Sequence, residues 1–203
     1  MPVSRRALLN APLTMAAWLR GASAADSPPA VIQRLYDVLL AVMKDAKHLS
    51  FDQRYQRLAP AISQAYNLPL MSRLSVGPGW TQLQPAQQQR LTELFSRYTI
   101  SVYANRFDDY GGERLEVDPS PAANPNGLIV QTRLIKSDGD KVTLNYLMRQ
   151  DGGGPWQVID IYLSGTISEL AARRSEFSGV LQQSGAEGLA KLLEDHTAAL
   201  RTG

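Results

Sequence analysis

The sequence predicts an α+β protein, in which a four-stranded antiparallel meander sheet packs with helices that precede and follow it in the chain. Two observations predict this class. Apolar residues recur at helical spacing through the first half of the chain, and strand-like alternation replaces that spacing after Gly111-Gly112. Helical spacing returns after residue 166. Helices that are segregated from an antiparallel sheet are typical of the α+β class.

The first half of the chain is expected to form four helices. A strong breaker, Gly77-Pro78-Gly79, separates the third from the fourth, and Pro60 should kink or divide the second. The fourth is the longest, at roughly 39 Å for 1.5 Å per residue. The expected helices cover residues 28–47, 51–66, 67–74 and 85–110.

Four strands are expected next, at residues 113–117, 128–136, 141–149 and 156–163. The Ser137-Asp138-Gly139-Asp140 turn joins the second and third, and residues 118–127, with three prolines, are expected to form a loop. The last strand is apolar on both alternations, with Val158 and Tyr162 on one side and Ile159, Ile161 and Leu163 on the other. A strand of this kind is usually buried on both faces, so we place it at the centre of the sheet.

Two helices, at about 167–183 and 185–200, should close the chain. Thr166 and Glu169 have the spacing of a capping box, and so do Ser184 and Glu187.

The N-terminus has the pattern of an export signal. Arg5 and Arg6 precede an apolar run over residues 7–19, and Ala22-Ser23-Ala24 follows as a small-residue cleavage site. We therefore predict a signal peptide at residues 1–24, compatible with the twin-arginine route, and a single domain at residues 25–203. Without the signal, Lys and Arg fall from 21 to 18 against 19 acidic residues, which leaves a net charge of −1. A nearly neutral protein has no general field for nucleic acid, so we expect no such partner.

Few residues could carry catalysis. The chain has no cysteine and two histidines, His48 and His196, both expected at the surface, so we predict no metal site and no cofactor. Asp160 is the exception, because it lies within the apolar strand. It could act as a base of raised pKa in an enclosed cavity, or it could be a structural carboxylate paired with Arg173, Arg174, Arg133 or backbone N–H groups.

Aromatic residues concentrate in the central and C-terminal segments, and they could line a pocket or fill an ordinary core. A series of short motifs narrows this choice. The series includes Leu70-Met71-Ser72-Arg73 before Gly77 and Trp80, and it ends on Trp156, Asp160, Gly165 and Arg174-Ser175-Glu176-Phe177.

In order and spacing, these motifs resemble the MlaC/toluene-tolerance (Ttg2-type) family of periplasmic lipid-binding proteins. The sequences of residues 164–168 and 173–177 resemble those of the hopanoid-biosynthesis-associated branch of the family, HpnM. Arg173 departs from the pattern, since the family usually has an aromatic residue there.

The resemblance implies an NTF2-like or cystatin-like fold around an apolar cavity, and a carrier, not an enzyme. Such a carrier would shuttle hopanoid or phospholipid across the periplasm between an inner-membrane transporter complex and an outer-membrane acceptor or donor. The alternatives are a small periplasmic isomerase-like enzyme that uses Asp160, and a scaffold protein with a solid core. Arg73, Arg133 or Arg174 would meet a lipid headgroup. Under this resemblance, we expect the pocket to be lined by Leu70, Met71, Trp80, Phe95, Tyr98, Tyr103, Phe107, Val130, Tyr146, Val158, Tyr162 and Phe177.

Overall fold

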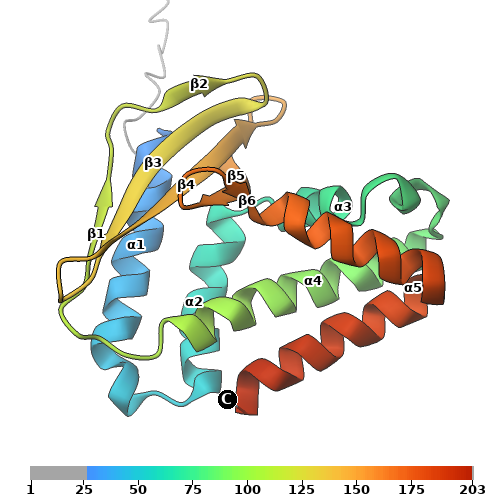
Figure 1. Ribbon diagram of the computed structural model, residues 1–203, viewed down its shortest axis with the longest axis horizontal. Helices are drawn as coiled ribbons and strands as arrows, with labels where there is room; N and C mark the ends of the chain where they lie inside the picture. The colour runs from blue at the N-terminus through green and yellow to red at the C-terminus, as the bar shows by residue number, and fades with distance from the viewer. Residues whose placement is uncertain (1–26, 203) are drawn as a thin grey trace, which may run out of the picture.

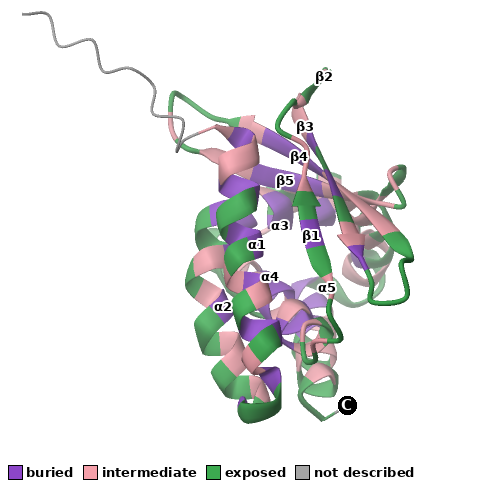
Figure 2. Cartoon of the chain, turned by 90° about the vertical axis from the view of Figure 1, so that its left-hand side faces the viewer, coloured by how far each residue is buried: buried purple, intermediate pink, exposed green. Residues whose placement is uncertain are grey.

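The structure, a computed structural model, describes residues 27–202, and the predicted signal peptide lies outside them. An antiparallel sheet packs one face against a group of helices, and the C-terminal helical segments extend away from the sheet (Figure 1). Buried positions gather along the central strands and on the helix faces turned toward them (Figure 2). The predicted α+β class is confirmed.

Four helices precede the sheet, as expected: α1 (Pro28–Asp45), α2 (Phe51–Ala65), α3 (Leu68–Val76) and α4 (Pro85–Arg106). Short 3₁₀ turns follow α1 and α3, as η2 (Ala46–His48) and η3 (Gly77–Gln82). Ser50 caps α2, because its hydroxyl accepts from the Gln53 N–H while the Gln53 side chain accepts from the Ser50 N–H. Helix α2 continues through Pro60, so the proline does not divide it; Leu58 and Ile62 hold it in the core on either side.

The last helix, α5 (Glu169–Thr202), consists of two arms that fold back beside α4 (Figure 1). The break is Gly185, whose φ of 65° lies in the left-handed region that favours glycine. The expected pair of helices is therefore confirmed. Their predicted first cap is wrong, because Ser168 and not Thr166 accepts from the first turn, at the Ala171 N–H. Residues 167–168 are held as a strand instead.

The sheet has six strands in the order β1-β3-β4-β5-β6, with β2 paired to β3, and all pairs are antiparallel. The four expected strands are β1, β3, β4 and β5. The predicted central position of β5 is wrong, because β5 is next to last in the sheet and the two-residue β6 pairs with its outer edge. Strands β2 and β6 were not predicted because two or three residues are too short to show alternation. The bounds are β1 Arg114–Val117, β2 Ala122–Asn124, β3 Gly127–Ile135, β4 Lys141–Gln150, β5 Trp156–Leu163 and β6 Ile167–Ser168.

A β-bulge in β5 determines which side chains face the helices. Tyr146 pairs with Ile161 and Met148 with Val158, so Ile159 is the extra residue. Val158 and Ile161 therefore share a face, although simple alternation would separate them. The predicted pairing of Val158 with Tyr162 on one face is wrong for this reason: Tyr162 turns to the opposite face, with Asn145.

Candidate functional site

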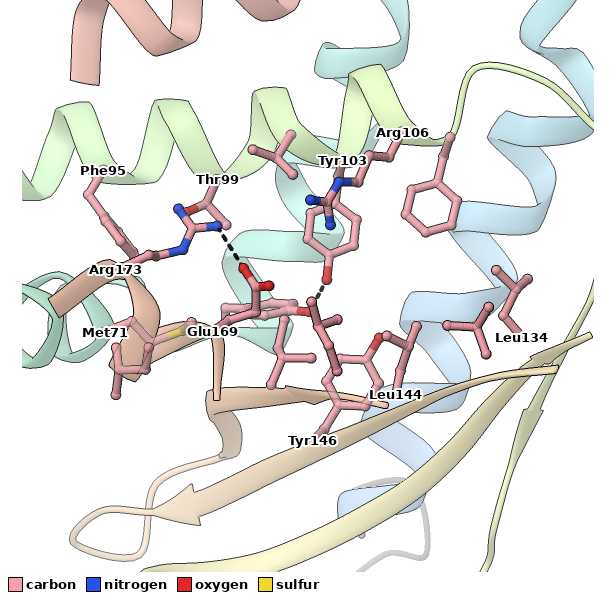
Figure 3. Close-up of a pocket in the computed structure, with 17 residues that line it drawn as sticks. Met71, Phe95, Thr99, Tyr103, Arg106, Leu134, Leu144, Tyr146, Glu169 and Arg173 are labelled. Atoms are coloured by element: carbon pink, nitrogen blue, oxygen red, sulfur yellow. Dashed lines mark hydrogen bonds and ion pairs between the residues drawn. The ribbon is translucent and has the colours of Figure 1, made fainter. Parts of the chain in front are cut away.

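The candidate site is a cavity of about 370 Å³ between α4, the helix-facing side of the sheet and the first turns of α5 (Figure 3). Its walls are mostly apolar. The seventeen lining residues are Tyr66, Met71, Phe95, Thr99, Val102, Tyr103, Arg106, Phe107, Leu134, Val142, Leu144, Tyr146, Ile161, Leu163, Glu169, Leu170 and Arg173.

Helix α4 forms one wall because Phe95, Thr99, Tyr103 and Arg106 recur at three- and four-residue spacing, which places them on one helix face. The opposite wall is the sheet. Alternate residues of β4 point to it, and the bulge adds Ile161 and Leu163 from β5. The cavity therefore depends on the bulge as much as on the hydrophobic pattern.

Four tyrosines meet at the sheet side of the cavity. The hydroxyls of Tyr66 and Tyr103 are hydrogen bonded to each other, and that of Tyr36 lies 3.2 Å from that of Tyr146. Tyr36 also bonds the hydroxyl of Thr132. The network gives an otherwise apolar site a polar floor whose hydroxyls are mutually satisfied.

Burial raises the pKa of all four tyrosines. The pKa values of Tyr66 and Tyr146 lie well above the ordinary value of 10.0, and those of Tyr36 and Tyr103 are also raised, because the phenolate would lose its hydration. The phenols are therefore neutral at physiological pH.

The charged residues of the cavity are Arg106, Glu169 and Arg173. The Arg173 guanidinium lies over the ring of Tyr98 at 4.8 Å and of Phe95 at 5.9 Å. It also lies 3.6 Å from the Glu169 carboxylate, one turn earlier on α5. Helix α5 thus carries an ion pair into the wall of an apolar pocket.

Five predicted lining residues do line the cavity: Met71, Phe95, Tyr103, Phe107 and Tyr146. Three others, Val130, Val158 and Phe177, are buried in the core instead. The rest do not reach the cavity: Leu70 is half-buried on α3, Trp80 packs on the core from η3, Tyr98 contacts His196, and Tyr162 faces away.

The three predicted headgroup arginines also lie elsewhere. Arg73 is exposed on α3, Arg133 pairs with Glu116 across β1 and β3 on the outer face, and Arg174 donates to the carbonyl of Leu74. The arginines that line the cavity, Arg106 and Arg173, were not predicted for it. Two signals were available: Arg106 follows Tyr103 by three residues on α4, and Arg173 departs from the residue type that the family usually has at its position.

Asp160 does not line the cavity. Its carboxylate accepts from the backbone N–H groups of Ile161 and Leu170 and from the Ser168 hydroxyl, at 2.7, 3.0 and 2.6 Å. It therefore ties β5 to the start of α5. The structural alternative is the one that these contacts support, with backbone N–H groups and not an arginine as partners.

We expect Asp160→Asn to lower the free energy of unfolding by about 1–3 kcal/mol, because an amide cannot accept from three donors as a carboxylate does. Urea unfolding monitored by circular dichroism checks this. Asp151→Asn, at an exposed ion pair with Arg149, is the matched control and should change stability much less. An unchanged midpoint for Asp160→Asn would contradict the structural role.

Within residues 27–202, no group of three or more His, Asp or Glu side chains could hold a metal. None of the helices described there contains the extended apolar stretch that a membrane span requires. His48 is exposed, and His196 lies partly exposed against Tyr98.

The fold and site together define an α+β protein with a mostly apolar pocket between a sheet and its helices. The MlaC protein family model matches residues 33–195, and the chain belongs to that family. The toluene tolerance protein ttg2D of Pseudomonas putida is 28% identical over 102 residues, which are 50% of this chain and 46% of that protein. The chain thus matches about half the length of this curated relative.

A phospholipid-binding protein from Ralstonia solanacearum, solved in complex with a phospholipid, has a similar structure. The TM-score is 0.74 at 23% sequence identity, and the match covers 86% of this chain and 98% of that one. This likeness establishes the shared fold.

Proposed function

We propose that this protein is a periplasmic lipid carrier that holds the apolar part of a phospholipid or hopanoid in the cavity between α4, α5 and the sheet. The observation that carries the proposal is the cavity itself, an apolar space within a chain of the MlaC family. The phospholipid in the similarly folded Ralstonia protein supports a lipid cargo.

The energetics suit a carrier. Burying a 16-carbon chain gains about 13 kcal/mol at roughly 0.8 kcal/mol per CH₂, so release into water is negligible. A bilayer offers nearly the same apolar environment, and exchange between pocket and membrane can lie close to balance. Direction would then come from partners, which we propose to be an inner-membrane transporter complex and an outer-membrane acceptor or donor. The export-like N-terminus supports the periplasmic location.

The alternatives receive less support. An isomerase-like enzyme would need Asp160 in the cavity, whereas its carboxylate is occupied by three donors beside α5. A scaffold with a solid core does not fit a chain with a 370 Å³ apolar cavity.

A pocket-filling substitution tests the proposal. Leu144→Trp should project an indole into the cavity and reduce the amount of lipid that copurifies with the protein, as measured by native mass spectrometry and lipid extraction. Thr143→Trp is the matched control, because the neighbouring residue of β4 points to the opposite face and should leave the lipid unchanged. Absence of lipid from the unaltered protein, or equal lipid in all three proteins, would contradict a carrier with this pocket.

A further inference from the structure

Two buried polar atoms in the wall of the cavity have no hydrogen-bond partner: Oγ1 of Thr99 on α4 and Nη1 of Arg173 on α5. Thr99 is 5% exposed. Figure 3 shows the Arg173 guanidinium beside Thr99, at the same end of the cavity as Phe95. Buried polar groups are nearly always paired in native proteins, so two orphans that face one space point to a group that occupies it.

The Thr99 hydroxyl differs from its neighbours on the helix. Thr92 and Ser96 donate to the carbonyls of Gln88 and Thr92, four residues earlier, which is the ordinary partner for such a side chain in a helix. Thr99 makes no such bond, and its oxygen stays available to the cavity.

The Arg173 side chain is held in place, but its Nη1 has no hydrogen-bond partner. The rings of Tyr98 and Phe95 fix the plane of its guanidinium, and Glu169 lies 3.6 Å from its Nη2, beyond hydrogen-bond distance. Arg106 also lines the cavity, so its three charged residues carry a net positive charge. This environment favours an anionic partner over a second cation or a neutral group.

We propose that Thr99 and Arg173 form a polar subsite that binds an anionic oxygen group of the cargo, a phosphate ester or a carboxylate, inside the pocket. This inference rests on the proposed lipid carrier and names the class of lipid. The guanidinium donates from Nη1 and the Thr99 hydroxyl donates beside it, while the apolar chain lies along Leu144 and Ile161. A lipid without an anionic oxygen can offer these groups only a neutral acceptor. A hydrogen bond to a charged acceptor is roughly twice as strong, so the site should favour the anionic lipid.

The test is a competition between two lipids with identical acyl chains. The purified protein is incubated with vesicles that contain equal amounts of phosphatidylglycerol and diacylglycerol, and native mass spectrometry gives the ratio of the two bound lipids. We expect phosphatidylglycerol to dominate. Thr99→Val and Arg173→Phe should each lower the ratio by about tenfold or more, the effect of losing a hydrogen bond to a charged group.

Matched variants separate the subsite from general effects on packing. Thr92→Val removes a hydroxyl from the same helix outside the cavity and should keep the ratio, and Arg173→Lys should retain part of it by retaining the charge. Parallel incubations with oleate and with inorganic phosphate distinguish the source of the anion. If oleate displaces phosphatidylglycerol as well as phosphatidylglycerol itself binds, the subsite accepts a carboxylate. Inorganic phosphate at millimolar concentration should displace neither lipid.

If the unaltered protein binds phosphatidylglycerol and diacylglycerol equally well, the subsite is overturned and the carrier remains. The same holds if the ratio of the two bound lipids is equal in the unaltered protein, Thr99→Val and Arg173→Phe. Displacement by inorganic phosphate alone would overturn lipid recognition at this position. Capture of neither lipid by the unaltered protein would overturn the carrier and the subsite together.

Discussion

Phe177→Ala is expected to lower the free energy of unfolding by about 3–5 kcal/mol, the range for removing a buried aromatic ring from a core. Phe177 is 1% exposed and lies in the main hydrophobic cluster, where the first arm of α5 packs on α3 and α4. Phe177 is not among the residues that line the candidate cavity, so its truncation should leave a new void in the core. Denaturant unfolding at neutral pH measures the loss.

Phe107→Ala supplies the control with the same chemical change. Phe107 is half-buried in the cavity wall and stacks on Tyr103 at 5.5 Å. Its truncation enlarges a space that already exists, so we expect a smaller loss of stability and a larger change in bound lipid. Equal losses from the two variants would mean that Phe177 does not have the core role that its burial indicates.

Stability should fall steeply above pH 10, because the four clustered tyrosines resist ionisation in the folded protein. Their pKa values are raised by burial, so below pH 10 folded and unfolded chains are both neutral at these positions and the full stability is present. As pH rises past 10, the unfolded chain loses protons that the folded protein retains. Each tyrosine whose folded pKa lies well above 11 should then cost about 1.4 kcal/mol by pH 11.

Tyr36→Phe isolates this effect from the ionisation of lysines, which both proteins share. At pH 8 the variant should be less stable by about 1 kcal/mol, since it loses its bonds to Thr132 and Tyr146. At pH 11 it should match or exceed the unaltered protein, because one buried phenol no longer opposes folding. The check is thermal melting at intervals between pH 8 and 11; parallel curves for the two proteins would rule out a contribution from Tyr36.

Much of the fold follows from local pattern. The spacing of apolar residues located the helices, and their alternation located the four longer strands. Each of these elements is long enough for its period to repeat in the sequence. The turn at Gly185 was also predictable, since Ser184 and Gly185 interrupt a continuous helical pattern. Strands β2 and β6 were not predictable, because they have no alternating pattern of their own. They form by pairing with β3 and with β5, respectively.

The site was predicted only in part. Phe95, Tyr103 and Tyr146 were found because large aromatic residues in amphipathic elements face the interior, whether it is filled or hollow. The same reasoning could not separate them from Phe177 or Val158, which meet other side chains in the core. The headgroup arginines were chosen from motifs along the chain. The packing of α5 against α4 brings Thr99 and Arg173, which are 74 positions apart in the sequence, to one cavity.

The sequence by itself determined the element order, the α+β class and the resemblance to the family that the chain belongs to, because these depend on residue types at fixed spacing. The tertiary structure decided which side chains face the cavity. One bulged residue, Ile159, reverses the alternation of β5, so Ile161 and Leu163 reach the pocket while Tyr162 does not. The fold of α5 beside α4 places Arg173 over aromatic rings next to an unpaired hydroxyl. Strand register determines the first of these arrangements and long-range packing the second. Neither produces a periodic pattern in the sequence from which it could be predicted.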